Sequence, residues 1–488
     1  MARPAGGGRE GLSGWRAPAI LLATVAAACA TAFLGDFQFD DGRVIVDEPA
    51  VHSLPAWWAS MPGIRPLLKL SYALNWVSGL GLPGFHAVNV AIHLANALLA
   101  FALFRRLGPR RDGAALAGAL LFALHPVQTE AVAYVSGRST SLAAAFALAS
   151  VVCWLAGREA PRASPARLAT PLLFAASLLV KEMALVLPLS LVLVEASFGA
   201  RPFRWRSALR ATAAHWAVLG AGAVAFLAST AYARLLERTA GLRAPGPNLL
   251  THLHSLAWLA GQTLRIDLLN ADPALPAVTA PTLSSAVEAL ALLAAACLGI
   301  AFRRRPAGFA TLWFLLWLPA AGWWFPRPEP ANDRQLYLAL AGPAWLVGRG
   351  LASLLSAGGA RRLAGAAILA GLAAATAARN LVYADEVRFW QDVVSKAPAN
   401  ARGFNNLGFA LSRRCRIAEA EAALAEAVRL DPGYIRARVN LRLLREGEPL
   451  APPSAGPPRC GPAGEPGRAV SAPSVSSPGQ AGGAGRGP

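Results

Sequence analysis

The chain has 488 residues and a net charge of +19, and 55% of its residues are hydrophobic whereas only 15% are charged. Soluble globular proteins average about 45–50% apolar and about 25% charged residues. The composition therefore excludes an ordinary soluble enzyme and a disordered chain, and it predicts an all-α, polytopic membrane protein.

Apolar runs long enough to cross a bilayer recur along the chain. A hydrocarbon core about 30 Å thick needs roughly 20 apolar residues as a helix, because lipid cannot satisfy an open backbone. The short fifth and sixth runs meet at Lys181 and Glu182, so they form either a hairpin or one broken helix. The eleven predicted spans are residues 17–34, 85–104, 114–132, 139–157, 168–180, 183–198, 211–231, 284–302, 307–325, 335–356 and 362–380.

Arginine clusters set the predicted orientation of these spans. They precede the first span and follow the second, fourth, sixth, eighth and tenth spans. Because consecutive spans cross the membrane in opposite directions, all six clusters lie on the same side of it. The positive-inside rule makes that side cytoplasmic. We therefore expect a cytoplasmic N-terminus (1–16), a membrane domain (17–380) and an extracytoplasmic C-terminal region. The net positive charge is then explained by the arginine clusters that set the topology, and no nucleic-acid partner is expected.

The first external loop, residues 35–84, is rich in acids. Asp36, Asp40, Asp41, Asp47 and Glu48 are five carboxylates within 13 residues. In a pair such as Asp40-Asp41, one carboxylate can act as a general base while its neighbour positions a substrate or a cation. Like charges at close quarters also raise one pKa of the pair. The alternative is a solvated acidic loop that helps to keep this end outside.

Further charged residues are predicted at the same external face. Such residues are costly at membrane depth and usually face a cavity or a partner. Together they predict one extracytoplasmic site, in which the acidic residues carry out the chemistry and the basic residues bind an anionic head group. The alternatives are local roles, namely helix anchors for Arg65 and Arg334 and an ion pair within Lys181-Glu182. The residues in question are Glu130, Arg138, Lys181, Glu182, Asp333 and Arg334.

A polar stripe marks the second span. His86, Asn89, His93 and Asn96 share one helix face, which favours polar contacts between helices over a metal site. The five cysteines form no CxxC pair, which argues against zinc, redox or disulfide motifs. No metal-ligand spacing is present, so a divalent cation would have to be held by the acidic loop alone.

The region after the last span divides in two. Residues 381–446 are predicted to be helical, and residues 401–434 fit one 34-residue tetratricopeptide repeat (TPR) after half a repeat at 382–397. One and a half repeats cannot bury a continuous core. The helices therefore either dock on the membrane bundle or pair with another chain, as a plain stalk or as a device that recruits an acceptor. Residues 447–488 are rich in Pro, Gly and Ser and are predicted to be disordered.

Several motifs together resemble a known family. The acidic loop is followed in order by RPL (65–67), LNW (74–76), PGFHAVNVAIHLANALL (83–99), HPVQTEAVAYVSGR (125–138), KEMALVLP (181–188) and NDRQLYL (332–338). This series resembles the transmembrane and tetratricopeptide-repeat O-mannosyltransferases of the GT-C superfamily, over residues 30–340. Two positions depart from the family pattern: Gln128 replaces a common His, and Ser139-Thr140 replaces a stretch with an acid.

The resemblance implies an inverting transfer of one mannose-like sugar from a polyprenyl-phosphate-linked donor to an acceptor hydroxyl, on a protein, at the outer face. It implies that Asp40 is the leading candidate for the general base, with Asp41 in support. It also implies that cations near the outer face hold the donor phosphate. The cations that fit are Arg138, Lys181 and Arg334, and the supporting residues are His125, Glu130, Glu182 and Arg65.

Two other functional classes remain open at this point. A non-catalytic membrane scaffold would present the TPR-like helices to partner proteins. A transporter is disfavoured, because the charges gather at one face rather than at mid-bilayer. High Ala, Gly and Arg usage favours a bacterial plasma membrane, although an endoplasmic reticulum homologue would have the same geometry.

Overall fold

The computed structural model describes residues 15–61, 63–108, 112–158, 164–319, 326–327, 329–448 and 450. Within these ranges the protein is all-α and contains no strand, as the composition predicts. The predicted N-terminus (1–16) and tail (447–488) lie mostly outside the described residues, as does the end of the ninth predicted span (307–325).

A helix covers each predicted span in whole or in part. The main helices are α1 (Arg16–Cys29), α4 (Gly81–Leu107), α5 (Asp112–Leu124), α7 (Arg138–Gly157), α8 (Pro165–Val180), α9 (Leu187–Phe198), α11 (Ala213–Ala228), α14 (Leu283–Ala301), α15 (Pro306–Trp317), α17 (Ala341–Ser356) and α18 (Gly359–Asn380). Shorter or peripheral helices are α2 (Leu54–Ala59), α3 (Pro66–Val77), α6 (Thr129–Val132), α10 (Trp205–Ala211), α12 (Thr230–Ala240), α13 (Pro245–Gln262) and α16 (Leu336–Ala339).

Five helical segments of the described chain are long and apolar enough to cross a membrane. They are Arg16–Leu34, Gly81–Leu107, Val135–Gly157, Leu283–Ala301 and Gly359–Ala384. The number reaches eight if three pairs of helices, bent by 52° to 64°, each count as one span. The structure therefore supports a multi-pass membrane protein, and the count of eleven spans stays a prediction.

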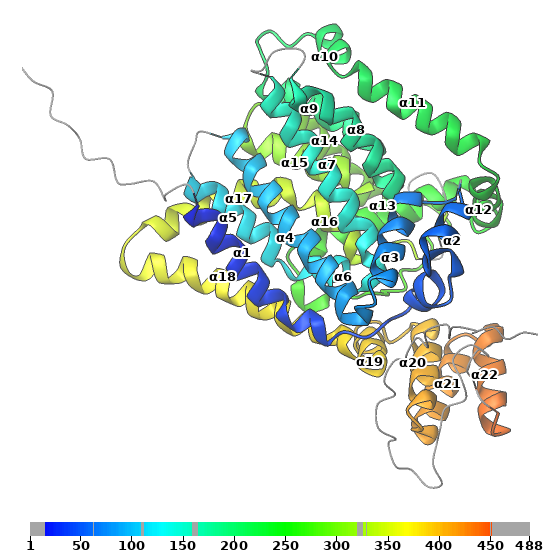
Figure 1. Ribbon diagram of the computed structural model, residues 1–488. Coiled ribbons are helices and arrows are strands. Elements are labelled where there is room, and N and C mark those ends of the chain that lie inside the picture. Colours follow the sequence, from blue (N-terminus) through cyan, green and yellow to red (C-terminus); the bar gives the residue numbers. More distant parts are fainter. Residues whose placement is uncertain are drawn as a thin grey trace, which may run out of the picture.

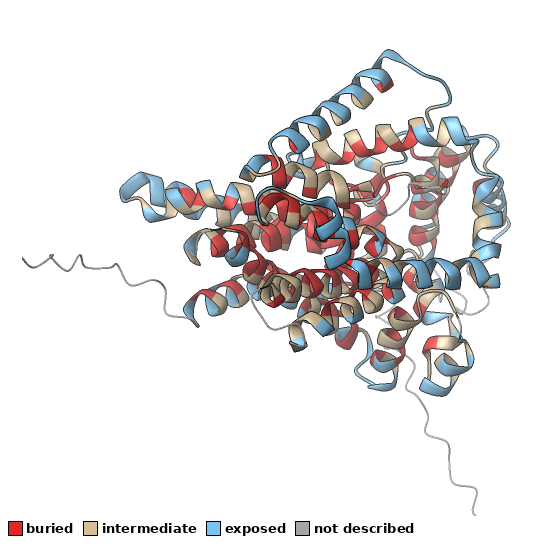
Figure 2. Ribbon diagram, turned by 90° about the horizontal axis from the view of Figure 1, so that it is seen from above, coloured by how far each residue is buried: buried red, intermediate tan, exposed pale blue. Residues whose placement is uncertain are grey.

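Helices α4, α5, α7 and α17 form the centre of the bundle (Figure 1). Buried residues concentrate there, and exposed residues lie toward the rim (Figure 2). Close approach requires glycine where α5 crosses α17: a Cβ added to Gly348 would lie only 2.4 Å from the Cα of Gly118. Small residues at helix contacts are typical of membrane bundles, where van der Waals packing replaces the hydrophobic driving force.

The polar stripe on α4 faces this interior, as predicted. The His93 ring lies 2.7 Å from the Tyr337 hydroxyl, and Asn96 donates to the carbonyl of Ser141 at 2.8 Å. Asn89 donates to the carbonyls of Val132 and Val135 at 3.1 and 3.2 Å. The stripe therefore connects helices, and Asn89 holds the loop that follows α6.

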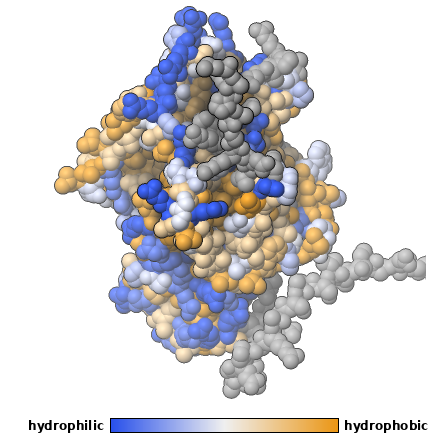
Figure 3. All heavy atoms as spheres, turned by 90° about the vertical axis from the view of Figure 1, so that its left-hand side faces the viewer, coloured by the Kyte–Doolittle hydropathy of each residue, from blue (hydrophilic) through white to orange (hydrophobic). Residues whose placement is uncertain are grey.

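Apolar side chains cover the outside of the bundle. Several on α14 are largely exposed, among them Leu283, Val287, Leu290, Leu293 and Leu298. Hydrophobic residues spread across the middle of the face in Figure 3, while hydrophilic residues gather at the bottom, where Figure 1 places the C-terminal helices. This pattern is that of a surface that meets lipid in its middle zone.

Four C-terminal helices lie below the bundle: α19 (Glu386–Lys396), α20 (Ala401–Arg413), α21 (Ile417–Leu430) and α22 (Ile435–Arg445) (Figure 1). Lys396 donates to the Leu269 carbonyl at 2.9 Å, and Asn400 donates to the Asp272 carbonyl at 2.9 Å. Of the two alternatives left open by the sequence, the structure shows docking on the same chain.

Candidate active site

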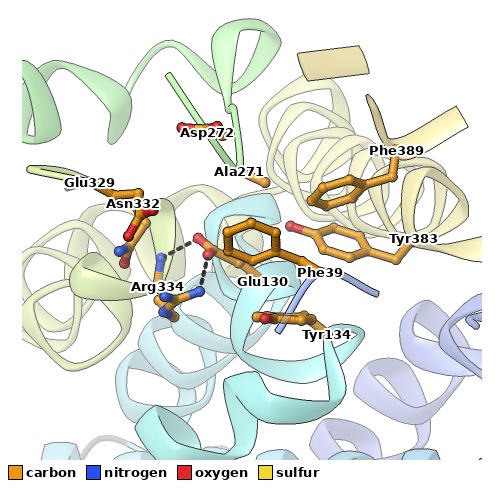
Figure 4. Close-up of a pocket in the computed structure, with 10 residues that line it drawn as sticks. All are labelled: Phe39, Glu130, Tyr134, Ala271, Asp272, Glu329, Asn332, Arg334, Tyr383 and Phe389. Carbon is orange, nitrogen blue, oxygen red and sulfur yellow. Dashed lines mark hydrogen bonds and ion pairs between the residues drawn. The ribbon is translucent and has the colours of Figure 1, made fainter. Parts of the chain in front are cut away.

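The loops predicted to be external meet around one small pocket, whose cavity volume is only about 10 Å³. The first loop, the end of α6, the loop before α14, the segment before α16 and the start of α19 all contribute to it (Figure 4). The lining residues are Phe39, Glu130, Tyr134, Ala271, Asp272, Glu329, Asn332, Arg334, Tyr383 and Phe389.

Asp41 fixes the acidic loop to the bundle. Its side chain is fully buried, and its two oxygens accept N–H groups from Gln38 at 3.0 Å and Ser136 at 2.7 Å. Burial raises the pKa of Asp41 to about 7. The N–H groups of Gln38 and Ser136 act in the opposite direction and lower this pKa, and the charge of Asp40 adds the smallest upward contribution. Because both oxygens are occupied inside the protein, Asp41 acts here as an anchor.

Asp40 is the accessible member of the pair. Its side chain is 38% exposed and lies 3.2 Å from Arg43, which is itself 82% exposed. Its backbone N–H donates to the Tyr134 hydroxyl at 3.0 Å, which places it beside the pocket. Phe39, the preceding residue, lines the pocket with a φ of +48°. A left-handed backbone is costly for a bulky residue and is often found at functional sites.

Glu130 and Arg334 form the charged floor of the pocket. Glu130 is buried and accepts the Arg334 backbone N–H at 2.8 Å and its guanidinium Nη1 at 2.6 Å. The guanidinium also lies over the Tyr134 ring, 5.7 Å from its centroid. His125 stands further back, where its Nδ1 accepts the Val127 N–H at 3.2 Å and caps a short helical turn.

Arg138 does not reach this pocket. Its buried guanidinium donates to Asn89 Oδ1 at 2.6 Å, to Asn75 Oδ1 at 2.7 Å and to the carbonyls of Ser71 and Phe85 at 3.1 and 3.0 Å. Four contacts to neutral acceptors engage most of its five N–H donors. Arg138 therefore holds α3, α4 and α7 together in this structure.

A cation cluster lies next to the pocket around Lys181, and we define it as Arg65, Lys181, Arg327 and Arg334. Lys181 is buried, and its Nζ donates to Thr140 Oγ1 at 2.6 Å. Burial, followed by the positive charges of Arg334, Arg65 and Arg327, lowers the pKa of Lys181 well below its ordinary value. These four cations therefore act electrostatically on one small region.

Two carboxylates neutralise half of the cation cluster. Arg65 donates to Glu182 at 2.7 Å, and Tyr232 of α12 donates to the same carboxylate at 3.2 Å. Burial opposes ionisation of Glu182, but Arg65 outweighs it and lowers the pKa of Glu182 to about 2. Glu182 therefore pairs with Arg65 rather than with Lys181, and Arg334 is paired with Glu130.

The C-terminal helices close one side of the pocket. Arg402 of α20 contacts the carboxylates of both Asp272 and Glu329, which line the pocket on two different loops. A second link runs from Asp333 through Arg379 to Asp392 of α19. Phe389 of α19 itself lines the pocket, so the docked helices form part of its wall.

The described part of the chain holds no group of three or more His, Cys, Asp or Glu side chains placed to bind a metal ion. The predicted site residues fall into three groups. Glu130 and Arg334 line the pocket, and Asp40 adjoins it through its backbone contact with Tyr134. Arg65, Lys181 and Glu182 form the region beside it. Asp41, His125 and Arg138 make contacts within the protein instead.

No family model matches the chain. Protein O-mannosyl-transferase Tmtc1 of Drosophila melanogaster is 47% identical over 92 residues, which cover 19% of this chain and 10% of that protein. TMTC4 of Homo sapiens is 35% identical over 164 residues (27% and 22%), and F38B6.6 of Caenorhabditis elegans is 32% identical over 143 residues (26% and 21%); both are named protein O-mannosyl-transferases.

Over part of its length, the chain is homologous to protein O-mannosyl-transferases. The aligned stretch spans about a tenth to a fifth of the length of the curated relatives it matches.

Some residues of the pocket and of the cation cluster of this O-mannosyl-transferase homologue were not predicted from the sequence. Tyr383 and Phe389 follow the last predicted span, in a region interpreted only as an appendage. Asp272 and Glu329 are isolated acids in loops without a motif. Arg327 lies in a nine-residue loop (326–334) in which only the NDR triplet stood out. Its position between two predicted spans at the external face was the one signal that could have identified it.

Proposed function

We propose that the protein is a membrane glycosyltransferase of GT-C type. It moves one mannose-like sugar from a polyprenyl-phosphate-linked donor to an acceptor hydroxyl, on a protein, at the extracytoplasmic face. The partial homology to protein O-mannosyl-transferases supports the reaction class. The eleven spans, the plasma-membrane location and the tetratricopeptide character of residues 382–446 belong to the same proposal.

The observation that carries the proposal is the excess of cations beside the pocket. Glu182 and Glu130 pair with Arg65 and Arg334, which leaves Lys181 and Arg327 without a carboxylate partner among the described residues. Buried charge is normally paired, because desolvation of a lone ion is expensive. A phosphate group supplies the missing negative charge, and bound there it would raise the pKa of Lys181 again.

The chemistry follows from the two sides of the pocket. Asp40 accepts the proton of the acceptor hydroxyl, whose oxygen attacks the anomeric carbon of the sugar. The bond between that carbon and the phosphate oxygen breaks, and the electron pair stays on the leaving lipid phosphate. Lys181, Arg334 and Arg327 stabilise the charge that builds there. Attack opposite the leaving group inverts the anomeric configuration.

Asp40 is better placed than Asp41 to act as the general base. A general base must come within hydrogen-bond reach of the proton that it removes. The Asp40 carboxylate is partly exposed on a residue that adjoins the pocket, whereas both oxygens of Asp41 are buried and occupied. This assignment refines the predicted pair into one base and one anchor.

The test compares two loop acids in the full-length chain reconstituted in liposomes with polyprenyl-phosphate-mannose and acceptor peptides. Asp40→Asn should lower transfer by about 10²- to 10⁴-fold, the usual range for losing a general base. Asp47→Asn is the matched control, because Asp47 is an exposed acid of the same loop. Equal activity of both variants would refute the assignment of Asp40.

The scaffold alternative makes the opposite prediction. If the protein only presented its C-terminal helices, loop acids would be dispensable and deletion of residues 382–446 would abolish function. The docking of α19 against the pocket favours the enzyme, because Phe389 is placed in the pocket wall rather than displayed to partners. A fully functional Asp40→Asn variant in cells would favour the scaffold.

A further inference from the structure

An open groove of about 410 Å³ lies between the last two helices, α21 and α22. Most of its lining comes from one face of α22, on which residues recur at spacings of three and four. Val428 and Leu441 are half-buried and apolar, and the other lining residues are charged. The lining residues are Val428, Arg438, Leu441, Arg442, Arg445 and Glu446.

The groove carries an excess of positive charge. Helix α22 contains four arginines and no acidic residue. Arg442 pairs with Glu446 at 2.8 Å and Arg445 pairs with Glu421 at 2.7 Å, through side chains that are 44% to 78% exposed. Exposed ion pairs of this kind are weak, so another carboxylate can join or replace them. Arg438 is exposed and forms no ion pair within the part of the chain that the structure describes.

Two large apolar side chains are exposed beside these arginines. Ile435 is 71% exposed and Val439 is 48% exposed, and they lie one helical turn apart on either side of Arg438 in the sequence. The last helix of a repeat array normally presents a polar outer face to water. Asn440 donates to Asn405 of α20 at 2.9 Å, so α22 is held against its neighbours and presents this mixed surface from a fixed position.

Three occupants of this surface match it poorly. Residues 451–488 of the same chain contain three arginines, one acid and no leucine, isoleucine or aromatic residue, so they offer the wrong charge and little apolar surface. A second copy of α22 would bring like charges together. The bilayer is disfavoured by position, because Figure 1 places α22 below the bundle and away from α14, whose apolar side chains meet lipid.

The spacing of the arginines matches an extended acidic chain. A rise of 1.5 Å per residue places Arg442 about 6 Å beyond Arg438 along α22, and Ile435 about 4.5 Å before it. In an extended peptide, side chains on one face recur about every 6.6 Å. A segment with acids at alternate positions therefore presents carboxylates at nearly the spacing of the two arginines, and an apolar residue two positions earlier reaches Ile435.

We infer that the face of α22 formed by Ile435, Arg438, Val439 and Arg442 is a docking site for an acidic, extended segment of a partner protein. Carboxylates of the segment pair with the two arginines, and its apolar residue packs on the two aliphatic side chains. The inference does not depend on sugar transfer, because no residue of this face belongs to the candidate active site. It defines the charge of the partner and the face that binds it, both of which the repeat pattern leaves open.

The experiment measures binding of a probe peptide to the full-length chain in phosphatidylcholine nanodiscs. The probe is the peptide LSESESE with a neutral dye, followed by fluorescence anisotropy in about 50 mM salt, where screening is weak. Arg438→Glu should weaken binding at least about tenfold, because it replaces an attraction by a repulsion. Ile435→Ala should weaken binding about threefold, because less apolar surface is buried. Salt at about 0.5 M should remove most of the binding.

Two controls make the result specific. Arg388→Glu changes the net charge by the same amount at an exposed arginine of α19, which contacts only the Leu381 carbonyl at 3.3 Å, and it should leave binding unchanged. The neutral peptide LSQSQSQ should bind at least about tenfold more weakly than LSESESE, because it lacks the carboxylates. Arg438→Glu should unfold at the wild-type temperature, because the side chain of Arg438 is exposed.

The inference is overturned if wild type binds the acidic and neutral peptides equally, or if Arg438→Glu binds the acidic peptide as tightly as Arg388→Glu does. Vesicles of phosphatidylglycerol test the bilayer as the occupant: if they bind through Arg438 and the peptide does not, the face is a lipid site and the inference fails. Because none of these measurements involves transfer, their outcome is independent of the result for Asp40→Asn.

Discussion

Two buried cations of this protein have contrasting surroundings. Arg138, where α7 begins, is enclosed by four acceptors and lies between the rings of Tyr72 and Phe85, 5.0 and 5.3 Å from their centroids. Lys181, after α8, has one neutral partner, Thr140, and sits among other cations. From sequence both were expected to hold the donor phosphate.

The difference separates a structural cation from one that is ready for a ligand. The acceptors around Arg138 satisfy it without help from outside, so its removal would damage the empty protein. The surroundings of Lys181 oppose its charge. Replacing Lys181 should therefore not destabilise the protein without a ligand, and should weaken only the state with a bound phosphate. Stability and transfer should therefore respond in opposite ways to the two mutations.

The largest effect is expected for Arg138→Met. Losing the guanidinium leaves several buried acceptors unpaired at about 1–3 kcal/mol each, so we expect a loss of at least about 3 kcal/mol in stability. Thermal unfolding in detergent, followed by size-exclusion chromatography, measures it. Arg106→Met is the control, because Arg106 is exposed at the end of α4. A well-folded Arg138→Met variant with impaired phosphate binding would contradict the structural role of Arg138 and show that it binds the ligand.

Lys181→Met should have the opposite signature. Transfer is expected to fall by about 100-fold, as it does when one group that stabilises a developing charge is lost. The unfolding temperature should stay the same or rise, because a buried amine among cations is replaced by an apolar chain of similar length. Lys69→Met is the matched control, because Lys69 pairs with Glu48 at 3.3 Å. If Lys181→Met lowers stability and transfer together, Lys181 is structural after all.

Much of the fold could be predicted from the sequence. Apolar runs and the absence of strand patterns predict an all-α membrane protein, and the polar stripe on α4 predicts buried contacts between helices. The number of spans could not be fixed, because bends such as that between α16 and α17, of 63°, depend on packing rather than on hydropathy.

The candidate site was predicted only in part. The motifs predicted that Asp40, Glu130 and Arg334 share one face. In the structure Glu130 and Arg334 line one pocket, and Asp40 adjoins it. The separate roles of Asp40 and Asp41 depend on which carboxylate meets the N–H groups of Gln38 and Ser136, which a dipeptide cannot show. The pocket wall from α19 depends on how the C-terminal helices dock, and no local pattern encodes that.

The smallest effect is expected at the link between the C-terminal helices and the pocket. Arg402 is 28% exposed and bridges Asp272 and Glu329, so Arg402→Ala removes the ion pair that each of these two pocket carboxylates makes with α20. We expect a moderate loss, about tenfold in kcat/KM, with little change in overall unfolding, because partly exposed ion pairs contribute weakly to stability. Arg413→Ala is the control, because Arg413 pairs with Glu386 farther from the pocket and is 50% exposed. Arg402→Lys should restore only part of the activity, since one ammonium group cannot reproduce the planar fork that contacts both carboxylates. If Arg402→Ala retains full activity, the C-terminal helices adjoin the pocket without contributing to transfer.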